Sequence, residues 1–542
     1  MTTVAIAPSY SPRTGRRVDG PAESTAEEVA AVLDAAARAF PLVSATPPAV
    51  RAGWLEAIAW ALEANADRLA ALADEETALG GPRLLGELAK CAASARFYGS
   101  VAAAGHWVGA LVDTVPGPVP SVLRRANVAL GPVAVFGASN FPFGFGVLGH
   151  DTCSAIAAGC SVVVKAHPAH PRLSAALAEL AVQALAEAGA PDGTFGLVSG
   201  FDAGLALVDA PEVSALAFTG SQRAGLALAE RAAGREAPIP VFAEMGTVNP
   251  VVVTPSAAAG RDAIATGFVG SFTLGQGQFC TKPGLLLVPE GSGLAEAVAT
   301  ILAGAAPGPL LTQAIADGYG AGVERLTGAG GTVLAAAGDA AAGDGAVDTG
   351  EGGTGKGGTG EGGTGKGVAT KSSRAKGGDA GGADEGTAFT ARPVALRVDL
   401  DELQPGSPFL QECFGPMALV AEYASLGAAL AALARLQPSL AGAVMTAGPH
   451  DPDAGPLVAA LARQVGRVVV DGWPTGVATS WGMHHGGPWP AASRADATSV
   501  GSAALLRFTR PVCFQDVPAA ALPSFLCDDN PWSLPMSRTS TW

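Results

Sequence analysis

Short apolar runs alternate with helical stretches through the middle of the chain, and this alternation constrains the fold more than any other feature. The stretches between the runs are rich in Ala and Leu and have helical periodicity. The apolar runs occupy residues 132–136, 161–165, 195–198, 215–218 and 239–244. Such a pattern predicts right-handed βαβ units in a parallel sheet, with a nucleotide site at the carboxyl ends of the strands.

A second α/β pattern follows Asn249, so we expect a second parallel-sheet domain. Its strand-like runs lie at 251–253, 285–288, 392–398, 417–421 and 466–470, and its helical patterns at 257–274, 293–303 and 426–436. Ahead of the first pattern, three amphipathic helices are predicted, over 26–40, 50–79 and 84–105.

Two further segments are predicted to be extended. The Pro-rich segment 111–130 has the character of an excursion between domains. The last strand-like run, 503–514, holds Arg507 and Arg510 among apolar residues. A late strand of this kind can pair with a partner subunit through its free edge.

The segment 338–386 consists almost entirely of Gly, Ala, Thr, Lys, Glu and Asp, with Gly-rich units repeating between Thr349 and Gly367. Such a composition buries too little apolar surface to offset the entropy of ordering, which predicts a flexible surface insertion. We interpret it as a tolerated expansion, with an interaction tether as the alternative.

Composition and charge exclude several classes of function. The formal net charge is −15, which disfavours a nucleic-acid partner, and no apolar run reaches the length of a membrane span. The first 20 residues contain no apolar core of an export signal, and the seven cysteines form no CxxC pair, so a reducing cytoplasmic location is expected. Neither close histidine pair, His167/His170 or His484/His485, has a carboxylate or cysteine cluster beside it in the sequence, and no metal site is predicted.

Cys280 is the first candidate for chemistry. It lies in the segment 271–284, where small residues crowd both sides of one thiol, as they would where the backbone approaches a ligand closely. The alternative is a buried cysteine that acts as a small apolar residue.

Two further residues favour the interpretation of Cys280 as a nucleophile. Asn140 follows the first predicted strand and offers an amide donor, and Glu244 ends the fifth, where partial burial is expected to raise its affinity for protons.

Glycine motifs indicate where a dinucleotide could bind. The run Gly144-Phe-Gly-Val-Leu-Gly149 matches GxGxxG, but the acidic residue that would follow on the next strand is replaced by Lys165. An ordinary Rossmann loop is therefore doubtful, and Lys165 would suit a ribose edge or a 2′-phosphate.

A second motif, Gly220-Ser221 with Gly225, follows a strand and opens a helix. Ser221 can cap that helix, whose free N–H groups would face a diphosphate, although a simple capped helix start has the same pattern.

Six motifs, in this order, give the chain a resemblance to the aldehyde dehydrogenase superfamily. They are Ser139-Asn-Phe-Pro142, Lys165-Ala-His-Pro168, Phe218-Thr-Gly-Ser221, Glu244-Met-Gly246, Gly277-Gln-Phe-Cys280 and Glu412-Cys-Phe-Gly-Pro416. The phrases 137–142, 164–171, 471–476 and 485–488 are most similar to an NADP-using branch that includes 2,5-dioxopentanoate dehydrogenases.

The resemblance implies a fold and a division of the chain. It implies an α/β fold in which a Rossmann-like parallel-sheet cofactor domain, residues 1–110 and 130–246, is joined to a second α/β domain that is catalytic, residues 247–487. Segments 111–129 and 488–542 would form a small β element for oligomerisation, giving a homodimer or homotetramer.

The resemblance also implies roles for single residues. Cys280 would attack the aldehyde, Asn140 and the backbone N–H of Cys280 would hold the oxyanion, and Glu244 would activate water to hydrolyse the thioester. The residues implied to bind NADP or NAD are Lys165, His167, Pro168, Gly220, Ser221, Gly225, Glu412 and Phe414. Pro168 replaces a glutamate that would repel a 2′-phosphate, which favours NADP. The motif after the base, Gly246-Thr-Val248, departs from the family pattern and leaves the mobility of the base open.

The expected reaction is oxidation of a small aldehyde to the free acid, with a semialdehyde such as 2,5-dioxopentanoate as substrate and 2-oxoglutarate as product. Three alternatives stay open at this point: an NADP-dependent dehydrogenase of fatty or medium-chain aldehydes, a CoA-acylating dehydrogenase, and an inactive scaffold. Glu244 argues against acylation of CoA, since such enzymes generally lack that base.

Overall fold

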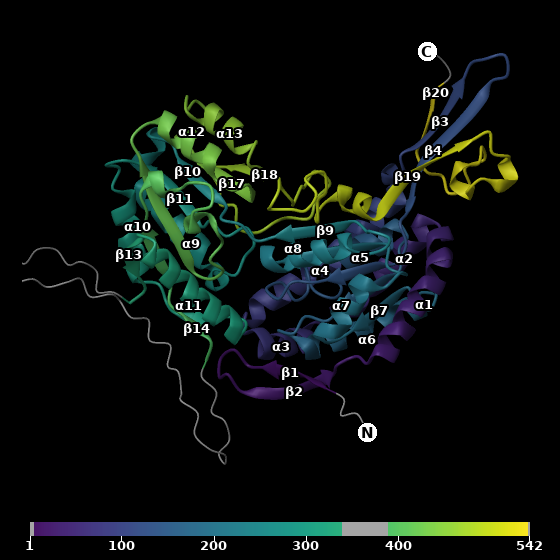
Figure 1. Cartoon of the computed structure of the whole chain (residues 1–542), viewed down its shortest axis with the longest axis horizontal. Helices are drawn as coiled ribbons and strands as arrows, with labels where there is room; N and C mark the ends of the chain where they lie inside the picture. The colour runs from purple at the N-terminus through teal and green to yellow at the C-terminus, as the bar shows by residue number, and fades with distance from the viewer. Residues whose placement is uncertain (1–4, 339–387, 540–542) are drawn as a thin grey trace, which may run out of the picture.

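A computed structural model describes residues 5–338 and 388–539. Its first half is built on a five-stranded parallel sheet in the order β7-β6-β5-β8-β9. These strands are β5 (Val133–Phe136), β6 (Val162–Lys165), β7 (Phe195–Val198), β8 (Ala215–Gly220) and β9 (Val241–Met245). The labels β9 and β7 in Figure 1 mark the two edge strands of this sheet. The predicted βαβ units are thus confirmed within a few residues of each expected run.

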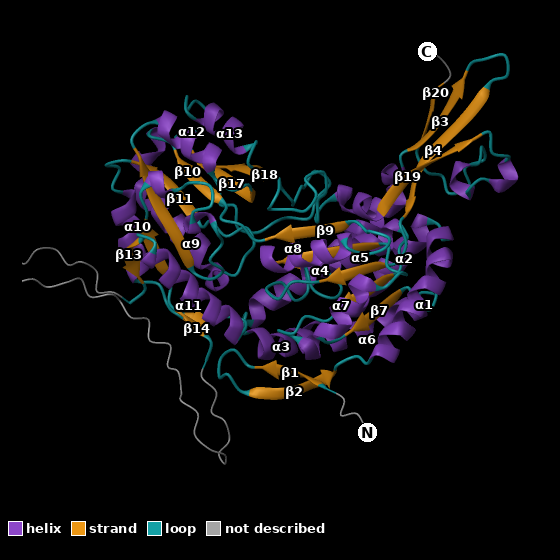
Figure 2. Ribbon diagram, in the orientation of Figure 1, coloured by secondary structure: helices purple, strands orange, loops and turns teal. Residues whose placement is uncertain are grey.

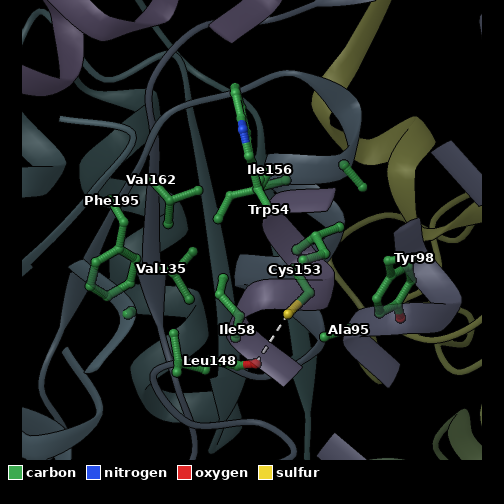
Figure 3. Packing of buried hydrophobic residues seen from close by; sticks show 14 of the residues in the cluster. Trp54, Ile58, Ala95, Tyr98, Val135, Leu148, Cys153, Ile156, Val162 and Phe195 are labelled. Atoms are coloured by element: carbon green, nitrogen blue, oxygen red, sulfur yellow. Dashed lines mark hydrogen bonds between the residues drawn. The ribbon is translucent and has the colours of Figure 1, made fainter. Parts of the chain in front are cut away.

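Helices cover both faces of this sheet (Figure 2). They are α1 (Ala26–Ala45), α2 (Pro48–Ala64), α3 (Ala66–Thr77), α4 (Gly81–Ala104), α5 (His150–Ala158), α6 (Pro171–Glu187), α7 (Phe201–Asp209) and α8 (Gln222–Ala233). Because strand side chains alternate, Val133 and Val135 pack with Trp54 and Ile58 on one face, as Figure 3 shows for part of that cluster. The intervening Ala134 joins a second cluster formed with α1, α7 and α8 on the other face. Burial on both faces explains why each strand is a continuous apolar run.

The second half contains a seven-stranded sheet in the order β13-β15-β16-β11-β10-β17-β18, parallel except for the edge strand β13. Its strands are β10 (Pro250–Val253), β11 (Leu285–Pro289), β13 (Thr332–Ala336), β15 (Val394–Arg397), β16 (Met417–Tyr423), β17 (Ser439–Met445) and β18 (Val465–Val470). Its helices are α9 (Arg261–Thr273), α10 (Leu294–Ala303), α11 (Gln313–Gly328), α12 (Leu426–Arg435) and α13 (Ala454–Leu461). The second α/β pattern is therefore confirmed, although the sequence did not reveal the central strand β17 or the edge strand β13.

Three small sheets complete the described structure. A four-stranded sheet, β19-β4-β3-β20, stands out from the body of the molecule (Figure 1). Its strands are β3 (Ala110–Val115), β4 (Ser121–Ala129), β19 (Thr509–Gln515) and β20 (Met536–Thr539). An N-terminal hairpin joins β1 (Ile6–Tyr10) to β2 (Arg17–Ala22), and β12 (Gly308–Pro309) pairs with β14 (Thr390–Ala391). The hairpin reaches the second half of the chain, where the Phe389 N–H donates to the carbonyl of Pro12 at 2.9 Å.

Two predicted elements are wrong in part. The long helix over 50–79 is broken at Asn65, which separates α2 from α3. The expected strand 503–514 begins with a 3-10 helix, Ser502–Phe508, and becomes a strand only at Thr509. The reason is tertiary, because the guanidinium of Arg507 is buried there in an ion pair with Asp151, 2.7 Å long. Within the chain, β19 pairs with β4 through its whole length.

The predicted insertion 338–386 lies, apart from its first residue, outside the described residues. Within the parts of the chain that the structure describes, no helix is both long enough and apolar enough to cross a membrane.

Candidate active site

A cavity of about 1180 Å³ lies at the carboxyl ends of the first parallel sheet and is closed on its other side by segments of the second half. All five strands of the first sheet deliver residues to it at or just after their ends, as the fold predicts. Of the predicted site residues, the following line the cavity: Asn140, Lys165, His167, Pro168, Gly220, Ser221, Glu244, Cys280, Glu412 and Phe414.

Gly225 is the predicted site residue that does not line this cavity. It is buried in α8, where an added Cβ would lie 2.7 Å from the sulfur of Met245 and 3.1 Å from the ring of Phe218. The glycine therefore allows α8 to pack closely on β8 and β9. Its contribution to a ligand would be indirect, through the position of the helix.

The segment before Cys280 follows an unusual path. Gly275, Gln276 and Gly277 all have positive φ angles, of 56°, 57° and 66°. A Cβ at Gly277 would lie 2.2 Å from the carbonyl oxygen of Gly415, so only glycine fits this approach. After the turn, the side-chain amide of Asn249 donates to the carbonyl of Cys280 at 2.8 Å and holds the backbone of the thiol residue in place.

Cys280, His485 and Glu244 form a contiguous group. The sulfur of Cys280 lies 3.6 Å from Nε2 of His485, and the same nitrogen lies 2.9 Å from Oε1 of Glu244. The hydroxyl of Ser499 donates to the other carboxylate oxygen of Glu244. The ligand atoms of Cys280, His485 and Glu244 all lie within 4.8 Å of one another. The group therefore has the composition of a thiol nucleophile with an adjacent base and a third group that orients it.

The electrostatics of this group differ from the sequence expectation. Burial alone would raise the pKa of Glu244, but His485, by charge and hydrogen bond, and the hydroxyl of Ser499 outweigh it and hold the pKa below its ordinary value. The predicted raised proton affinity of Glu244 is therefore wrong. The prediction did not include His485 and Ser499, because both are distant from Glu244 in the sequence. The pKa of the Cys280 thiol is raised well above its ordinary value, first by burial and then by the charges of Glu244 and Glu412. The resting thiol is protonated at neutral pH.

Asn140 follows the end of β5, at the same edge of the sheet as Glu244, and its amide points to the nucleophile segment. Its Nδ2 donates to the carbonyl of Gln278 at 2.8 Å. The backbone carbonyl of Asn140 accepts a hydrogen bond from the guanidinium of Arg83, also at 2.8 Å. The amide of Asn140 is thus held against the backbone of Gln278, two residues before Cys280.

Glu412 is a partly buried residue on the cavity wall. Burial raises the pKa of Glu412 to about 7, although the ammonium of Lys282 acts in the other direction. Its Oε1 has no hydrogen-bond partner among the described residues, and a Cβ at Gly246 would lie 2.1 Å from Oε2. Gly246 therefore leaves the space that Glu412 occupies, and Glu412 retains an acceptor for a ligand hydroxyl.

Lys165 and the start of α8 also line the cavity. Burial lowers the pKa of Lys165. Ser221 caps α8, as predicted, by accepting a hydrogen bond from the Ala224 N–H at 3.3 Å. The rings of His167 and His170 stack at 5.4 Å, and burial lowers the pKa of His167 well below its ordinary value, so its ring is neutral.

The glycines of the GxGxxG match serve backbone packing. A Cβ at Gly146 would lie 2.0 Å from the carbonyl oxygen of Pro142, and one at Gly149 would lie 2.3 Å from that of Gly144. These glycines fold the loop after β5 onto itself. Gly144, Gly146 and Gly149 are not among the residues that line the cavity.

Sequence reasoning missed His485 as part of the site. The pair His484-His485 was visible in the sequence, but the partners of His485, Glu244 and Cys280, are more than 200 positions away. Cys280 and His485 are 205 positions apart. The hydroxyl of Ser499 and the guanidinium of Arg83 were missed for the same reason. The local signal was the run His485-Gly-Gly-Pro488, which the family resemblance included without giving His485 a role.

Comparisons with known proteins agree with this geometry. The profile described as the aldehyde dehydrogenase family matches residues 3–345. Alpha-ketoglutaric semialdehyde dehydrogenase 2 of Azospirillum brasilense is 39% identical, over 98% of this chain and 95% of that protein. Alpha-ketoglutaric semialdehyde dehydrogenase of Acinetobacter baylyi is 35% identical, over 94% and 90%.

Among solved structures, an NAD-dependent aldehyde dehydrogenase from Sinorhizobium meliloti matches with a TM-score of 0.73 and 22% identity, covering 95% of this chain and 92% of that one. This likeness supports the α/β fold. The family profile covers more than half of the sequence, and the curated relatives extend the match over nearly all of it. The chain is therefore an enzyme of the aldehyde dehydrogenase family.

Proposed function

We propose that this enzyme oxidises a short semialdehyde bearing a carboxylate to the free acid, with 2,5-dioxopentanoate as substrate and 2-oxoglutarate as product. The observation that carries the proposal is the contiguous group of Cys280, His485 and Glu244, in which Cys280 and Glu244 line a cavity large enough for a dinucleotide. The names of the relatives from Azospirillum and Acinetobacter support this choice of semialdehyde.

The group can perform both halves of the reaction. As the sulfur of Cys280 bonds to the aldehyde carbon, Nε2 of His485, 3.6 Å from that sulfur, accepts the thiol proton and later releases it to solvent. The amide of Asn140 exchanges its bond to Gln278 for one to the developing oxyanion. After oxidation of the thiohemiacetal, the carboxylate of Glu244 takes one proton from water, which attacks the thioester, and then gives that proton to the departing sulfur. The acid leaves, and the sulfur regains its proton.

A nicotinamide dinucleotide, NADP or NAD, would supply the hydride acceptor for this oxidation. The residues present fit such a group. The unpartnered Oε1 of Glu412 can accept from the nicotinamide ribose, with Phe414 beside the ring, and the capped start of α8 at Gly220 and Ser221 offers free N–H groups to a diphosphate. Lys165 and Arg223 add positive charge to the cavity lining, which supports NADP.

The pKa of Glu412 predicts a pH dependence for cofactor binding. With a pKa of about 7, Glu412 is a carboxylate above neutral pH and loses a hydroxyl acceptor as pH falls. We expect cofactor affinity, measured by calorimetry, to fall by several-fold between pH 8 and pH 6. Glu412→Gln should bind more weakly at pH 8 and lose this dependence. A dependence that persists unchanged in Glu412→Gln would exclude Glu412 as its source.

Arg83 supports a carboxylate on the substrate. Its guanidinium lies 4.8 Å from the ring centroid of Phe279, the residue before Cys280, and 5.3 Å from that of Phe141, the residue after Asn140. One guanidinium nitrogen, Nη1, has no hydrogen-bond partner among the described residues. A cation that packs against the residues next to the nucleophile and the oxyanion amide, with an unused donor, is suited to a substrate carboxylate.

The function is tested with purified enzyme, both cofactors and two aldehydes of equal length, 2,5-dioxopentanoate and pentanal. We expect NADPH or NADH absorbance with the semialdehyde, and formation of 2-oxoglutarate without CoA. Arg83→Met should lower kcat/KM for 2,5-dioxopentanoate by about tenfold or more and leave that for pentanal within about twofold. Equal losses with both aldehydes would contradict the role of Arg83. No reduction of cofactor with either aldehyde would contradict the function itself.

We also propose a homodimer or homotetramer in the cytoplasm. The protruding sheet, β19-β4-β3-β20, leaves the outer edges of β19 and β20 unpaired within the described chain, and unpaired edges are suited to a second copy. The seven cysteines are all free, which suits a reducing compartment. Sedimentation of the purified enzyme tests the oligomeric state.

A further inference from the structure

The cavity contains a carboxylate that no site motif includes. Glu23 lies between β2 and α1 and lines the cavity together with Lys165, Ser199, Gly200 and Arg223. No hydrogen bond or ion pair among residues 5–338 and 388–539 engages the carboxylate of Glu23, the ammonium of Lys165 or the guanidinium of Arg223. These charges on the cavity wall are therefore available to a ligand.

The backbone holds Glu23 firmly at this position. The N–H of Glu23 donates to the carbonyl of Ala5 at 2.8 Å, and the N–H of Ser24 donates to that of Ser199 at 2.9 Å. In return, the N–H of Ser199 donates to the hydroxyl of Ser24 at 3.0 Å. The segment that carries Glu23 is thus fastened to the end of β7.

Its side chain then lies over the turn that follows β7. A Cβ built on Gly200 would lie 3.1 Å from Oε2 of Glu23 and 3.2 Å from its Cβ, so the carboxylate covers the glycine. Lys165 ends the neighbouring strand β6, in register with Val198 of β7. The charge of Glu23 acts on Lys165 by raising its pKa, against the larger effect of burial. Glu23 and Lys165 therefore face the same end of the cavity.

This position is where a dinucleotide fold selects its cofactor. An acidic group near the ribose accepts hydrogen bonds from the 2′-hydroxyl of NAD and repels the 2′-phosphate of NADP, whereas a cation does the opposite. The sequence has Lys165 and Pro168 where an acid could stand, and by itself this favours NADP. The fold brings in Glu23 from the N-terminal segment and restores a carboxylate.

We infer that Glu23 is a cofactor-selecting residue, whose carboxylate limits binding of a 2′-phosphate and accepts from a ribose hydroxyl. The inference rests on the proposed function in one respect, that the cavity takes a nicotinamide dinucleotide. Lys165 and Arg223 attract the 2′-phosphate, and Glu23 opposes them. The balance among these groups sets the ratio of NADP to NAD affinity.

The test uses the adenosine end of each cofactor, which binds without chemistry. Calorimetry measures the affinity of the full-length enzyme for 5′-AMP and for adenosine 2′,5′-bisphosphate. Glu23→Gln keeps the volume and the backbone bonds of the segment. We expect it to raise the affinity for the bisphosphate relative to 5′-AMP by about tenfold, since it removes one like charge at short range. The kcat/KM ratio of NADP to NAD should rise in parallel.

The matched control is Glu27→Gln, which removes the same charge from the exposed first turn of α1, outside the cavity lining. Lys165→Met should shift the ratio in the opposite direction. An unchanged ratio in Glu23→Gln, or the same shift in Glu27→Gln, would overturn the inference and leave the dehydrogenase proposal intact. Failure of the wild-type enzyme to bind either nucleotide would overturn both.

Discussion

Cys280→Ser is expected to lower steady-state aldehyde oxidation by at least about a thousandfold, because the hydroxyl is a far weaker nucleophile in the same position. The loss should appear in kcat, since the cofactor cavity is unchanged. Binding of NADP or NAD, measured by calorimetry, should stay within about twofold of the wild-type value. The measurement is the initial rate of NADPH formation with 2,5-dioxopentanoate.

Cys513→Ser is the matched control, because Cys513 is an exposed free thiol on β19. It should retain wild-type kcat. If Cys280→Ser kept more than a tenth of the wild-type rate, the thiol of Cys280 would not be the nucleophile. If instead the wild-type enzyme oxidised no aldehyde and a cellular effect of the protein survived Cys280→Ser, the scaffold alternative would be favoured.

Glu244→Gln is expected to separate the two halves of the reaction. Removing the carboxylate should leave the first turnover, since the thiol and the oxyanion amide remain, and should lower hydrolysis of the thioester by about a hundredfold or more. Stopped-flow measurement should therefore show a burst of NADPH close to the concentration of active sites, followed by a slow steady state. Addition of CoA tests whether the trapped acyl group can be transferred.

The same variant has an opposite expected effect on alkylation of Cys280. The charge of Glu244 contributes to the raised pKa of the Cys280 thiol, so its removal lowers that pKa and increases the thiolate fraction at a given pH. Iodoacetamide should modify Cys280 faster at pH 8 in Glu244→Gln than in the wild type. Slower alkylation together with loss of the burst would show that Glu244 acts in formation of the thioester as well as in its hydrolysis.

Much of the fold could be predicted because its signals are local. The strands of the first sheet are buried on both faces, so Val133–Phe136 and Val162–Lys165 stand out as apolar runs without any knowledge of their neighbours. Strand β17, Ser439–Met445, escaped notice because glycine and small residues interrupt its apolar pattern, although it is fully buried between β10 and β18.

The candidate site was predictable to the extent that its residues follow strands. Asn140, Lys165 and Glu244 come at or directly after strand ends, and parallel topology brings such positions to one edge. The prediction failed where a pKa depends on neighbouring groups that are distant in the sequence. The sequence indicated a raised pKa for Glu244, but His485 and Ser499 lower it, and neither could be placed beside it from sequence spacing.

The sequence by itself determined the class of fold and the set of residues around Cys280, because hydrophobic periodicity and short motifs are properties of adjacent positions. Only the tertiary structure decided which distant groups meet them: His485 beside Cys280, Arg507 beside Asp151, and Glu23 in the cavity with Lys165. The physical reason is that ionisation and ligand selectivity depend on charges and burial within a few ångströms in space. Those distances exist only once the separate halves of the chain have packed together.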